Sequence, residues 1–198
     1  MLKNISQDSL INAFFLSILA TAGIFYVNLG GSFLSAFVDG LNIARDSAGF
    51  IVSANKYGAA FGGLLAAIFI KKLSWRKTSY FLLIMLIFID ILSSFIPNAN
   101  LLILIRFFHG TVGGFLVGIG LSVIARTSFP DKVFGMLMVV QYSFGSIGIF
   151  TVPRLVEIFG YGAVFFVLIT FSLMTLLILP FIPNLKEKSV QVKSARYM

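Results

Sequence analysis

The chain has 198 residues, of which 59% are hydrophobic and 11% charged, and its formal net charge is +8. Soluble domains carry about 25% charged residues, and a chain of this length has too little interior to bury so much apolar surface, so the composition excludes an ordinary soluble protein. The chain has no cysteine and one histidine, which excludes disulfides, thiolate chemistry and Cys/His metal sites. It also has no glycine-rich phosphate loop, so we expect no enzyme, cofactor or metal.

Six long apolar segments follow one another, separated by short polar loops. In chain order they span residues 11–38, 47–70, 78–96, 101–125, 133–158 and 161–182. A helix needs about 20 apolar residues to cross the roughly 30 Å hydrocarbon core of a bilayer, whereas barrel strands have about 10 residues of alternating polarity. The sequence therefore predicts an all-α integral membrane protein, with a six-helix bundle over 1–183 and a polar, basic cytoplasmic tail over 184–198.

The cations gather in alternate loops. On one side of the predicted bundle lie Lys3, Lys71, Lys72, Arg76, Lys77, Arg126, Lys132, Lys186, Lys188, Lys193 and Arg196. The loops on the other side offer only Arg45. The positive-inside rule places both termini in the cytoplasm. Because topology accounts for the positive charge, we expect the bilayer and no nucleic acid as a partner. The expected location is a cell membrane, the bacterial inner membrane, with several passes.

The order of segments contains a candidate 3+3 inverted repeat. The stretch that begins at Gly49 can be laid over the stretch that begins at Gly135, which aligns Asn55 with Gln141. The second and fifth segments run in opposite directions, so the repeat would be inverted, as in many transporters. Chance recurrence of glycine and aliphatic residues is the alternative interpretation.

Small residues recur every four positions in three of the segments. These stripes are Gly31 with Ser35, Gly58 with Gly62, and Gly110 with Gly114 and Gly118. Small residues at this spacing form a flat face that another helix can approach closely. The stripes therefore predict close helix packing, and such smooth interfaces would also let helices rock during a transport cycle.

Three ionisable residues lie at membrane depth, where charges are costly and face a partner or a cavity. Asp90 and Arg106 flank the short turn 97–100 almost symmetrically, so we expect an ion pair that orients their helices. The alternative for Arg106 is that it faces a central cavity, where it binds an anionic group or couples to a proton. For Lys56, deep in the second segment, we expect a place in that cavity.

Other polar side chains accompany these charges. His109 lies one turn from Arg106 and titrates near neutral pH, so it suits proton exchange, with plain packing as the alternative. The remaining candidates for the cavity wall are Asn28, Asn55, Tyr57 and Gln141. Interhelical hydrogen bonding is the alternative for Asn28 and Gln141. Arg154 and Glu157, three residues apart, are predicted to form a local ion pair.

The fourth segment carries Leu102, Arg106 and His109 at intervals of four and three residues, and this pattern resembles a motif of the major facilitator superfamily. Leu102, Arg106 and His109 have the spacing of that family's fourth-helix motif, in which glutamine usually stands at the place of His109. The basic loop 71–77 lies where the family carries its signature between helices two and three, with Lys71 at the place of the usual aspartate. The chain resembles the N-terminal six-helix half of a drug/metabolite-type member.

This resemblance implies secondary active transport of small molecules by alternating access, with Arg106 facing the central cavity. Six helices form only one wall of such a cavity, so we expect a second bundle, either a second copy in a homodimer or another six-helix half. Lys56 and Arg106 suit an anionic substrate, and a proton or another ion is the candidate coupling ion. The alternative functions are a non-transporting scaffold or accessory subunit, or an inert truncated half of a full-length transporter.

Overall fold

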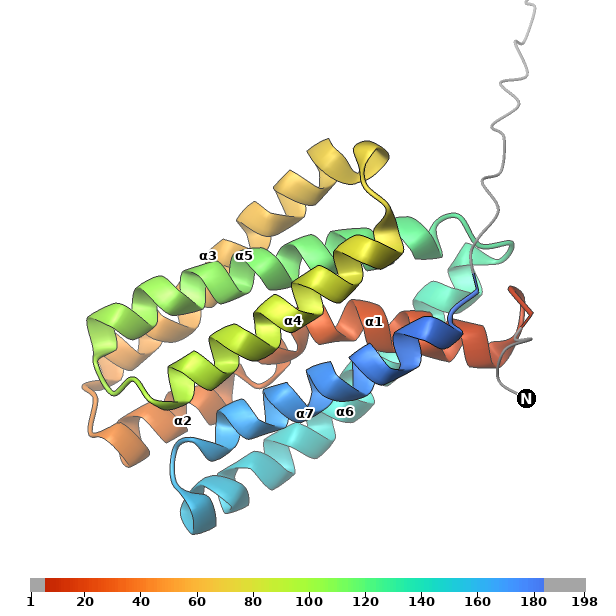
Figure 1. Ribbon diagram of the computed structural model, residues 1–198. Helices are drawn as coiled ribbons and strands as arrows, with labels where there is room; N and C mark the ends of the chain where they lie inside the picture. Colours follow the sequence, from red (N-terminus) through yellow and green to blue (C-terminus); the bar gives the residue numbers. More distant parts are fainter. Residues whose placement is uncertain (1–5, 184–198) are drawn as a thin grey trace, which may run out of the picture.

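The computed structural model describes residues 6–183, and every regular element within them is a helix (Figure 1). The helices are α1 (Leu10–Asn28), α2 (Gly30–Leu41), α3 (Arg45–Phe69), α4 (Trp75–Ser94), α5 (Ala99–Ile124), α6 (Pro130–Phe159) and α7 (Ala163–Ile178). Short 3₁₀ turns, Ile70–Lys72 and Leu179–Phe181, extend α3 and α7. With these extensions, α1 and α3 to α7 are long and apolar enough to cross a membrane. This confirms the predicted all-helical, multi-pass membrane protein. The predicted tail, 184–198, lies outside the described residues.

The first predicted segment, 11–38, is not one helix. It divides at Leu29, whose backbone has φ −94° and ψ 9°, and whose N–H approaches the carbonyls of both Phe25 and Tyr26. This tightened turn precedes Gly30 and Gly31, and glycine is a poor helix former because it loses the most backbone freedom. Beyond the break α2 continues to the end of the bundle. The other five predicted segments match single helices, with ends shifted by up to a few residues.

Local chemistry explains where several helices begin and end. The Ser9 hydroxyl accepts a hydrogen bond from the Asn12 N–H at 3.2 Å, and the Asn98 carboxamide oxygen accepts one from the Leu101 N–H at 3.0 Å. Both are N-caps that satisfy otherwise unpaired backbone groups. Pro130 opens α6, where its missing N–H costs nothing. Gly160 ends α6 with φ 78°, a conformation that favours glycine.

The closest packing in the bundle joins α3 to α5. Four glycines line this contact, Gly58, Gly62, Gly110 and Gly114. A side-chain carbon at Gly58 would overlap the Phe107 carbonyl oxygen of α5, and one at Gly110 would overlap the Asn55 carbonyl oxygen of α3. Two of the predicted small-residue stripes therefore meet each other, and the absence of side chains lets the two backbones touch.

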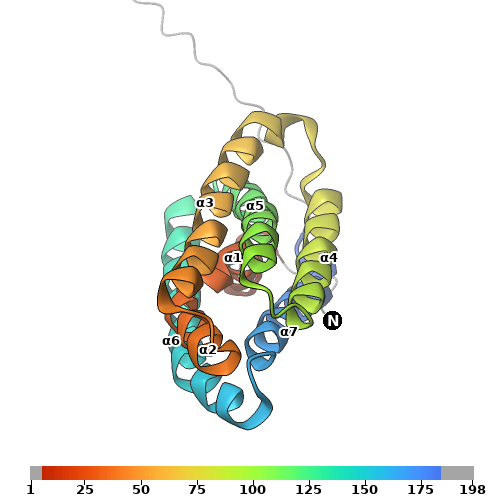
Figure 2. The same ribbon diagram turned by 90° about the vertical axis from the view of Figure 1, so that its left-hand side faces the viewer.

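The two sides of the bundle differ in which helices form them. Figure 2 shows α2, α3 and α6 on one side and α4 and α7 on the other, with α1 and α5 between them. Besides the α3–α5 pair, α6 packs chiefly against α1, and α4 packs against α7. The consecutive helices α6 and α7 thus pack mainly against different helices.

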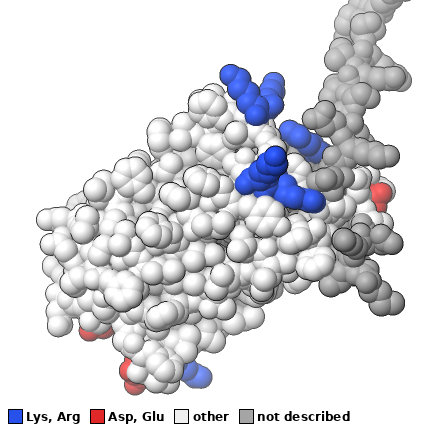
Figure 3. Space-filling view, viewed as in Figure 1, with Lys and Arg blue, Asp and Glu red and all other residues white. Residues whose placement is uncertain are grey.

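The charged residues lie mostly at the two ends of the bundle (Figure 3). At one end, which we call the basic end, the described cations are Lys71, Lys72, Arg76, Lys77, Arg126 and Lys132. The opposite end holds Arg45 and Arg154 together with Asp39, Asp46 and Glu157. The positive charge therefore gathers at the end that contains the α3–α4 and α5–α6 connections.

Candidate functional site

A buried polar cluster joins three membrane-spanning helices in the half of the bundle away from the basic end. It consists of Asn55 from α3, Asp90 and Ser93 from α4, and Arg106 and His109 from α5. The side chains of Asp90 and Arg106 have no exposed surface at all. Ionisable groups in an apolar interior need partners that replace water, so the contacts of this cluster determine what it can do.

The ion pair that the sequence predicts between Asp90 and Arg106 is present. The Arg106 Nη1 donates to Asp90 Oδ1 at 2.9 Å. The Nη2 of the same guanidinium donates to the Ser93 hydroxyl and to the Ile89 carbonyl oxygen, the latter at 3.4 Å. One arginine of α5 therefore binds two turns of α4, which fixes the depth of one helix against the other.

His109 is the second side chain that contacts the Asp90 carboxylate, after Arg106. Its Nε2 lies 3.3 Å from Asp90 Oδ2, and its Nδ1 lies 2.8 Å from the Asn55 amide nitrogen. An amide N–H₂ is a donor only, so the Nδ1 that faces it is the acceptor and Nε2 carries the proton. Asn55 also donates to the Arg106 carbonyl oxygen at 3.2 Å. The network is thus consistent with a neutral His109 beside a charge-balanced ion pair.

Aromatic rings enclose the guanidinium. The Arg106 Cζ lies 5.6 Å from the ring centroid of Tyr26 on α1 and 5.1 Å from that of Phe165 on α7. Both distances allow attraction between the cation and the ring. Within the described residues, the Tyr26 hydroxyl and the Arg106 Nε have no hydrogen-bond partner. The cluster thereby reaches five of the seven helices.

Sequence reasoning missed one member of this cluster, Ser93, and the ring of Tyr26 that packs beside it. Tyr26 lies in a strongly apolar stretch. The sequence indicates its place only through the general tendency of a buried tyrosine hydroxyl to lie near polar groups. Ser93 had a clearer signal, because it lies three residues after Asp90 and so shares its helix face.

The single polar cavity predicted for Lys56, Arg106, Asn28 and Gln141 is not formed within the described residues. Arg106 is fully buried and points toward α4, whereas Lys56 is exposed on the surface of the bundle and has no hydrogen bond or ion pair with a described residue. Helix geometry separates Lys56 from its neighbour Asn55, because consecutive residues point about 100° apart.

The other predicted residues lie elsewhere. Asn28 and Gln141 join α1 to α6, since the Asn28 Nδ2 donates to the Gln141 carbonyl oxygen and the Gln141 Nε2 donates to the Asn28 Oδ1, both at 3.4 Å. Tyr57 is 73% exposed. Arg154 and Glu157 are both exposed, and the ion pair predicted between them is not formed. Exposed pairs gain little from contact, so their side chains are free to point apart.

Comparison with protein-family models finds no model that matches the chain, and comparison with curated proteins finds no relative.

Proposed function

We propose that the chain is one half of a secondary transporter of the major facilitator type and moves small anionic molecules by rocking of two six-helix bundles. The observation that carries the proposal is Lys56, an exposed and unpaired lysine on a membrane-spanning helix. It follows Arg45, the first residue of α3, by eleven positions, or about 16 Å of helix, which is near the middle of a roughly 30 Å core. Placing a lysine there raises the free energy of membrane insertion by about 2.5–3.5 kcal/mol. Its ammonium group therefore requires contact with water or with an anion.

The surroundings of Lys56 support a second bundle on this side. The side of the bundle around it carries small residues that are exposed or half-buried, namely Gly31, Ser35, Gly49, Ala60, Gly63 and Ala67. Among the described residues, nothing lies within 4 Å of where a Cβ would stand at Gly31, Gly49 or Gly63. Small residues at a helix surface suit contact with another helix.

The opposite side has the character of a lipid-facing surface. On α4 and α7 the exposed residues are large and apolar, among them Phe81, Phe88, Phe166 and Leu177. Large apolar side chains such as Phe61 on α3 and Phe150 on α6 are exposed as well, so the two sides differ chiefly in the exposed small residues around Lys56. Because lipid tails impose no need for small residues, this difference favours protein against α2, α3 and α6 and lipid against α4 and α7.

The pairing of the spans supports the inverted repeat expected for this family. Counting α1 with α2 as the first span, the second span packs against the fourth (α3 with α5) and the fifth against the first (α6 with α1). If spans one, two and three are exchanged with spans four, five and six, the contact between spans two and four becomes the contact between spans five and one, and the reverse also holds. The same exchange leaves the α1–α5 and α4–α7 contacts unchanged, as an approximate two-fold relation requires.

The distribution of cations supports a cytoplasmic basic end. The chain has no cysteine, so Ser74→Cys and Asn98→Cys would each carry a single thiol. We expect an impermeant maleimide to label Ser74→Cys only from the cytoplasmic side and Asn98→Cys only from the other side. Labelling of Asn98→Cys from the cytoplasm would reverse the proposed orientation.

A second copy is the simplest second bundle, related by a two-fold axis along the membrane normal. In such a dimer the contacts are reciprocal. Since α3 and α6 lie at opposite edges of the shared side, the rotation sets α3 of one copy against α6 of its partner. Ala60 on α3 and Tyr142 on α6 are both exposed there.

We therefore expect differently tagged copies, one with Ala60→Cys and the other with Tyr142→Cys, to form a disulfide-linked dimer when they are coexpressed and oxidised in native membranes. The matched control is Phe88→Cys with Phe166→Cys on the lipid side, which should stay monomeric. A protein that transports as a monomer would refute the dimer. Dimers without any transport would instead favour the accessory-subunit alternative.

A further inference from the structure

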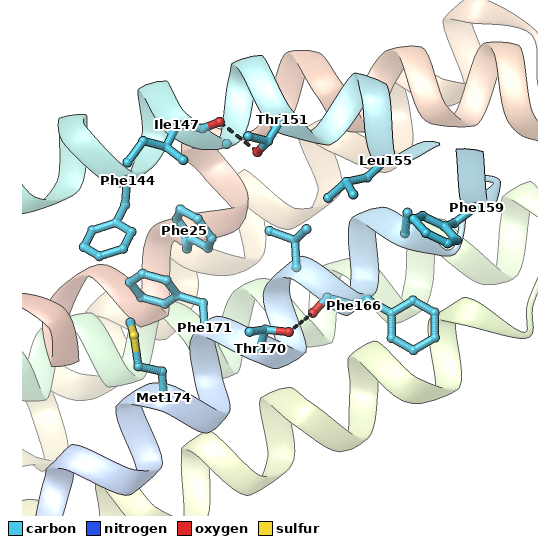
Figure 4. Close-up of a pocket in the computed structure, with 13 residues that line it drawn as sticks. Phe25, Phe144, Ile147, Thr151, Leu155, Phe159, Phe166, Thr170, Phe171 and Met174 are labelled. Carbon is cyan, nitrogen blue, oxygen red and sulfur yellow. Dashed lines mark hydrogen bonds between the residues drawn. The ribbon is translucent and has the colours of Figure 1, made fainter. Parts of the chain in front are cut away.

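A groove opens between α6 and α7, on a part of the molecule that the proposed transport mechanism does not use. It has a volume of about 570 Å³, within the range of about 300–1,000 Å³ typical of ligand sites. Figure 4 shows its lining, which includes Phe25, Phe144, Phe159, Phe166, Phe171 and Met174. The groove exists because α6 packs chiefly against α1 and α7 chiefly against α4, so the two consecutive helices diverge.

The groove has a solid aromatic floor. The rings of Phe25 and Phe171 stack with their centroids 4.2 Å apart, and Phe144 meets Phe171 edge-on at 5.2 Å. These three rings come from α1, α6 and α7 and close the space toward the bundle interior. The open side of the groove therefore faces away from the buried polar cluster.

The side chains of the lining offer no free hydrogen-bond donor. Its only side-chain hydroxyls belong to Thr151 and Thr170, and each donates to the carbonyl oxygen of its own helix, at 2.8 Å to Ile147 and at 2.7 Å to Phe166. Both bonds are drawn in Figure 4. A polar ligand would replace few of its hydrogen bonds to water here, since only the two threonine oxygens could accept one, so the groove suits a hydrocarbon.

Its length suits one chain of a lipid. Phe159 follows Phe144 by fifteen positions on α6, so the groove extends along about 22 Å of this helix. This exceeds half of the roughly 30 Å hydrocarbon core, so an acyl chain from the leaflet at the α6–α7 turn fits within it. Since these helices span the membrane, such chains surround them.

A cation stands beside the mouth of the groove. Arg154 is exposed, unpaired within the described residues, and about 60° around α6 from Thr151, whereas Glu157 lies about 120° from Thr151. A phosphate next to the groove would thus lie nearer to the arginine than to the glutamate. Tyr142, on the side proposed for the second bundle, is about 180° from Thr151, so a second copy need not cover the groove.

We propose that this groove binds one acyl chain of a phospholipid, whose headgroup phosphate lies against Arg154. The chain fills the space over Phe25 and Phe171, and the guanidinium gives the site a preference for anionic headgroups. The site is independent of the transport proposal, because it uses neither Lys56 nor the buried cluster.

Native mass spectrometry of the purified protein tests the proposal. After equilibration with palmitoyl-oleoyl phosphatidylglycerol in mild detergent, we expect one tightly retained lipid per chain. Thr170→Phe and Ala163→Phe fill the groove at two places and should each lose that lipid. Ile84→Phe, on the exposed side of α4, is the matched control and should keep it. Two filling variants are used, and the circular dichroism of each is measured to confirm that it is helical. A loss of lipid in both then cannot be due to the misfolding of one variant.

Arg154→Gln separates the headgroup contact from the chain contact. We expect this variant to retain phosphatidylglycerol about fivefold more weakly, with a smaller change for phosphatidylcholine. Unchanged lipid retention in both filling variants would overturn the acyl-chain site. Equal retention of phosphatidylglycerol by wild type and Arg154→Gln would overturn the placement of the phosphate.

Discussion

Replacing Arg106 by alanine should lower the free energy of unfolding by about 3–5 kcal/mol. The guanidinium neutralises Asp90 and donates to Ser93 and to the Ile89 carbonyl oxygen, and all of these groups are inside the bundle. Alanine would leave the carboxylate with His109 as its only side-chain partner among the described residues and would open a cavity between Tyr26 and Phe165. An uncompensated buried charge is among the most destabilising changes a protein can suffer.

Reversible unfolding in mixed micelles, followed by far-ultraviolet circular dichroism, measures this loss. Arg126→Ala is the matched control, because Arg126 is exposed at the basic end, and it should change stability by less than about 0.5 kcal/mol. The double variant Asp90→Leu with Arg106→Met removes both charges. It should lose clearly less than the sum of the two single variants, because neither charge is then left alone.

This comparison also decides between the two interpretations of Arg106. If Arg106→Ala stays within about 1 kcal/mol of wild type, the ion pair is not what stabilises the bundle. Should that stable variant also lose transport, Arg106 would have to contact the substrate during the cycle. A variant that loses stability, while the protein that remains folded keeps its specific activity, would assign the residue to helix positioning.

Lys56→Gln should remove anion binding and leave the fold intact. Lys56 has no partner within the described residues, so its loss leaves no buried group unpaired. Losing one partner of a desolvated charge pair costs about 2 kcal/mol or more, or about thirtyfold in affinity. The bundle itself should be no less stable, because an exposed lysine near the membrane centre opposes insertion by about 2.5–3.5 kcal/mol.

Two measurements check this prediction with the same panel of probes, inorganic phosphate, sulfate and short mono- and dicarboxylates. An anion that binds the wild type should stabilise it by about 2.7 kcal/mol at 100 times its dissociation constant, and Lys56→Gln should lose that stabilisation. Uptake of the same anion into proteoliposomes should fall in parallel. Lys56→Arg keeps the charge and Lys77→Gln removes a cation from the basic end, so both should retain binding. Undiminished uptake by Lys56→Gln would exclude Lys56 as the anion site.

The proton-coupling role predicted for His109 can be tested in the same vesicles. His109 lies between Asp90 and Asn55 and is almost completely buried. If it carries a coupling proton, His109→Gln should abolish the response of uptake to an imposed proton gradient and leave exchange of substrate across the membrane. A normal response in that variant would leave His109 as a packing residue.

Several parts of the fold followed from the sequence because the bilayer imposes simple rules. The thickness of the hydrocarbon core determined the number and length of the spans, and the short turn between Asp90 and Arg106 made antiparallel neighbours that could pair. The break at Leu29 did not follow, because the stretch from Leu10 to Val38 carries no charge and is predominantly apolar, and hydropathy does not record backbone angles. The spacing of the glycines predicted flat faces on individual helices. It did not predict which of these faces would pack against each other.

The sequence by itself determined an all-helical, multi-pass membrane protein with three costly charges within its spans. Only the tertiary structure decided which of these charges are buried in an ion pair and which is exposed without a partner. Arg106 and Asp90 cancel each other inside the bundle, whereas Lys56 stays unpaired on its surface. The physical reason is that a residue's position along a helix determines its depth and its angle on that helix, but its partner depends on which helix packs against that face. That choice was made by glycines that let α3 and α5 touch, far along the chain from one another.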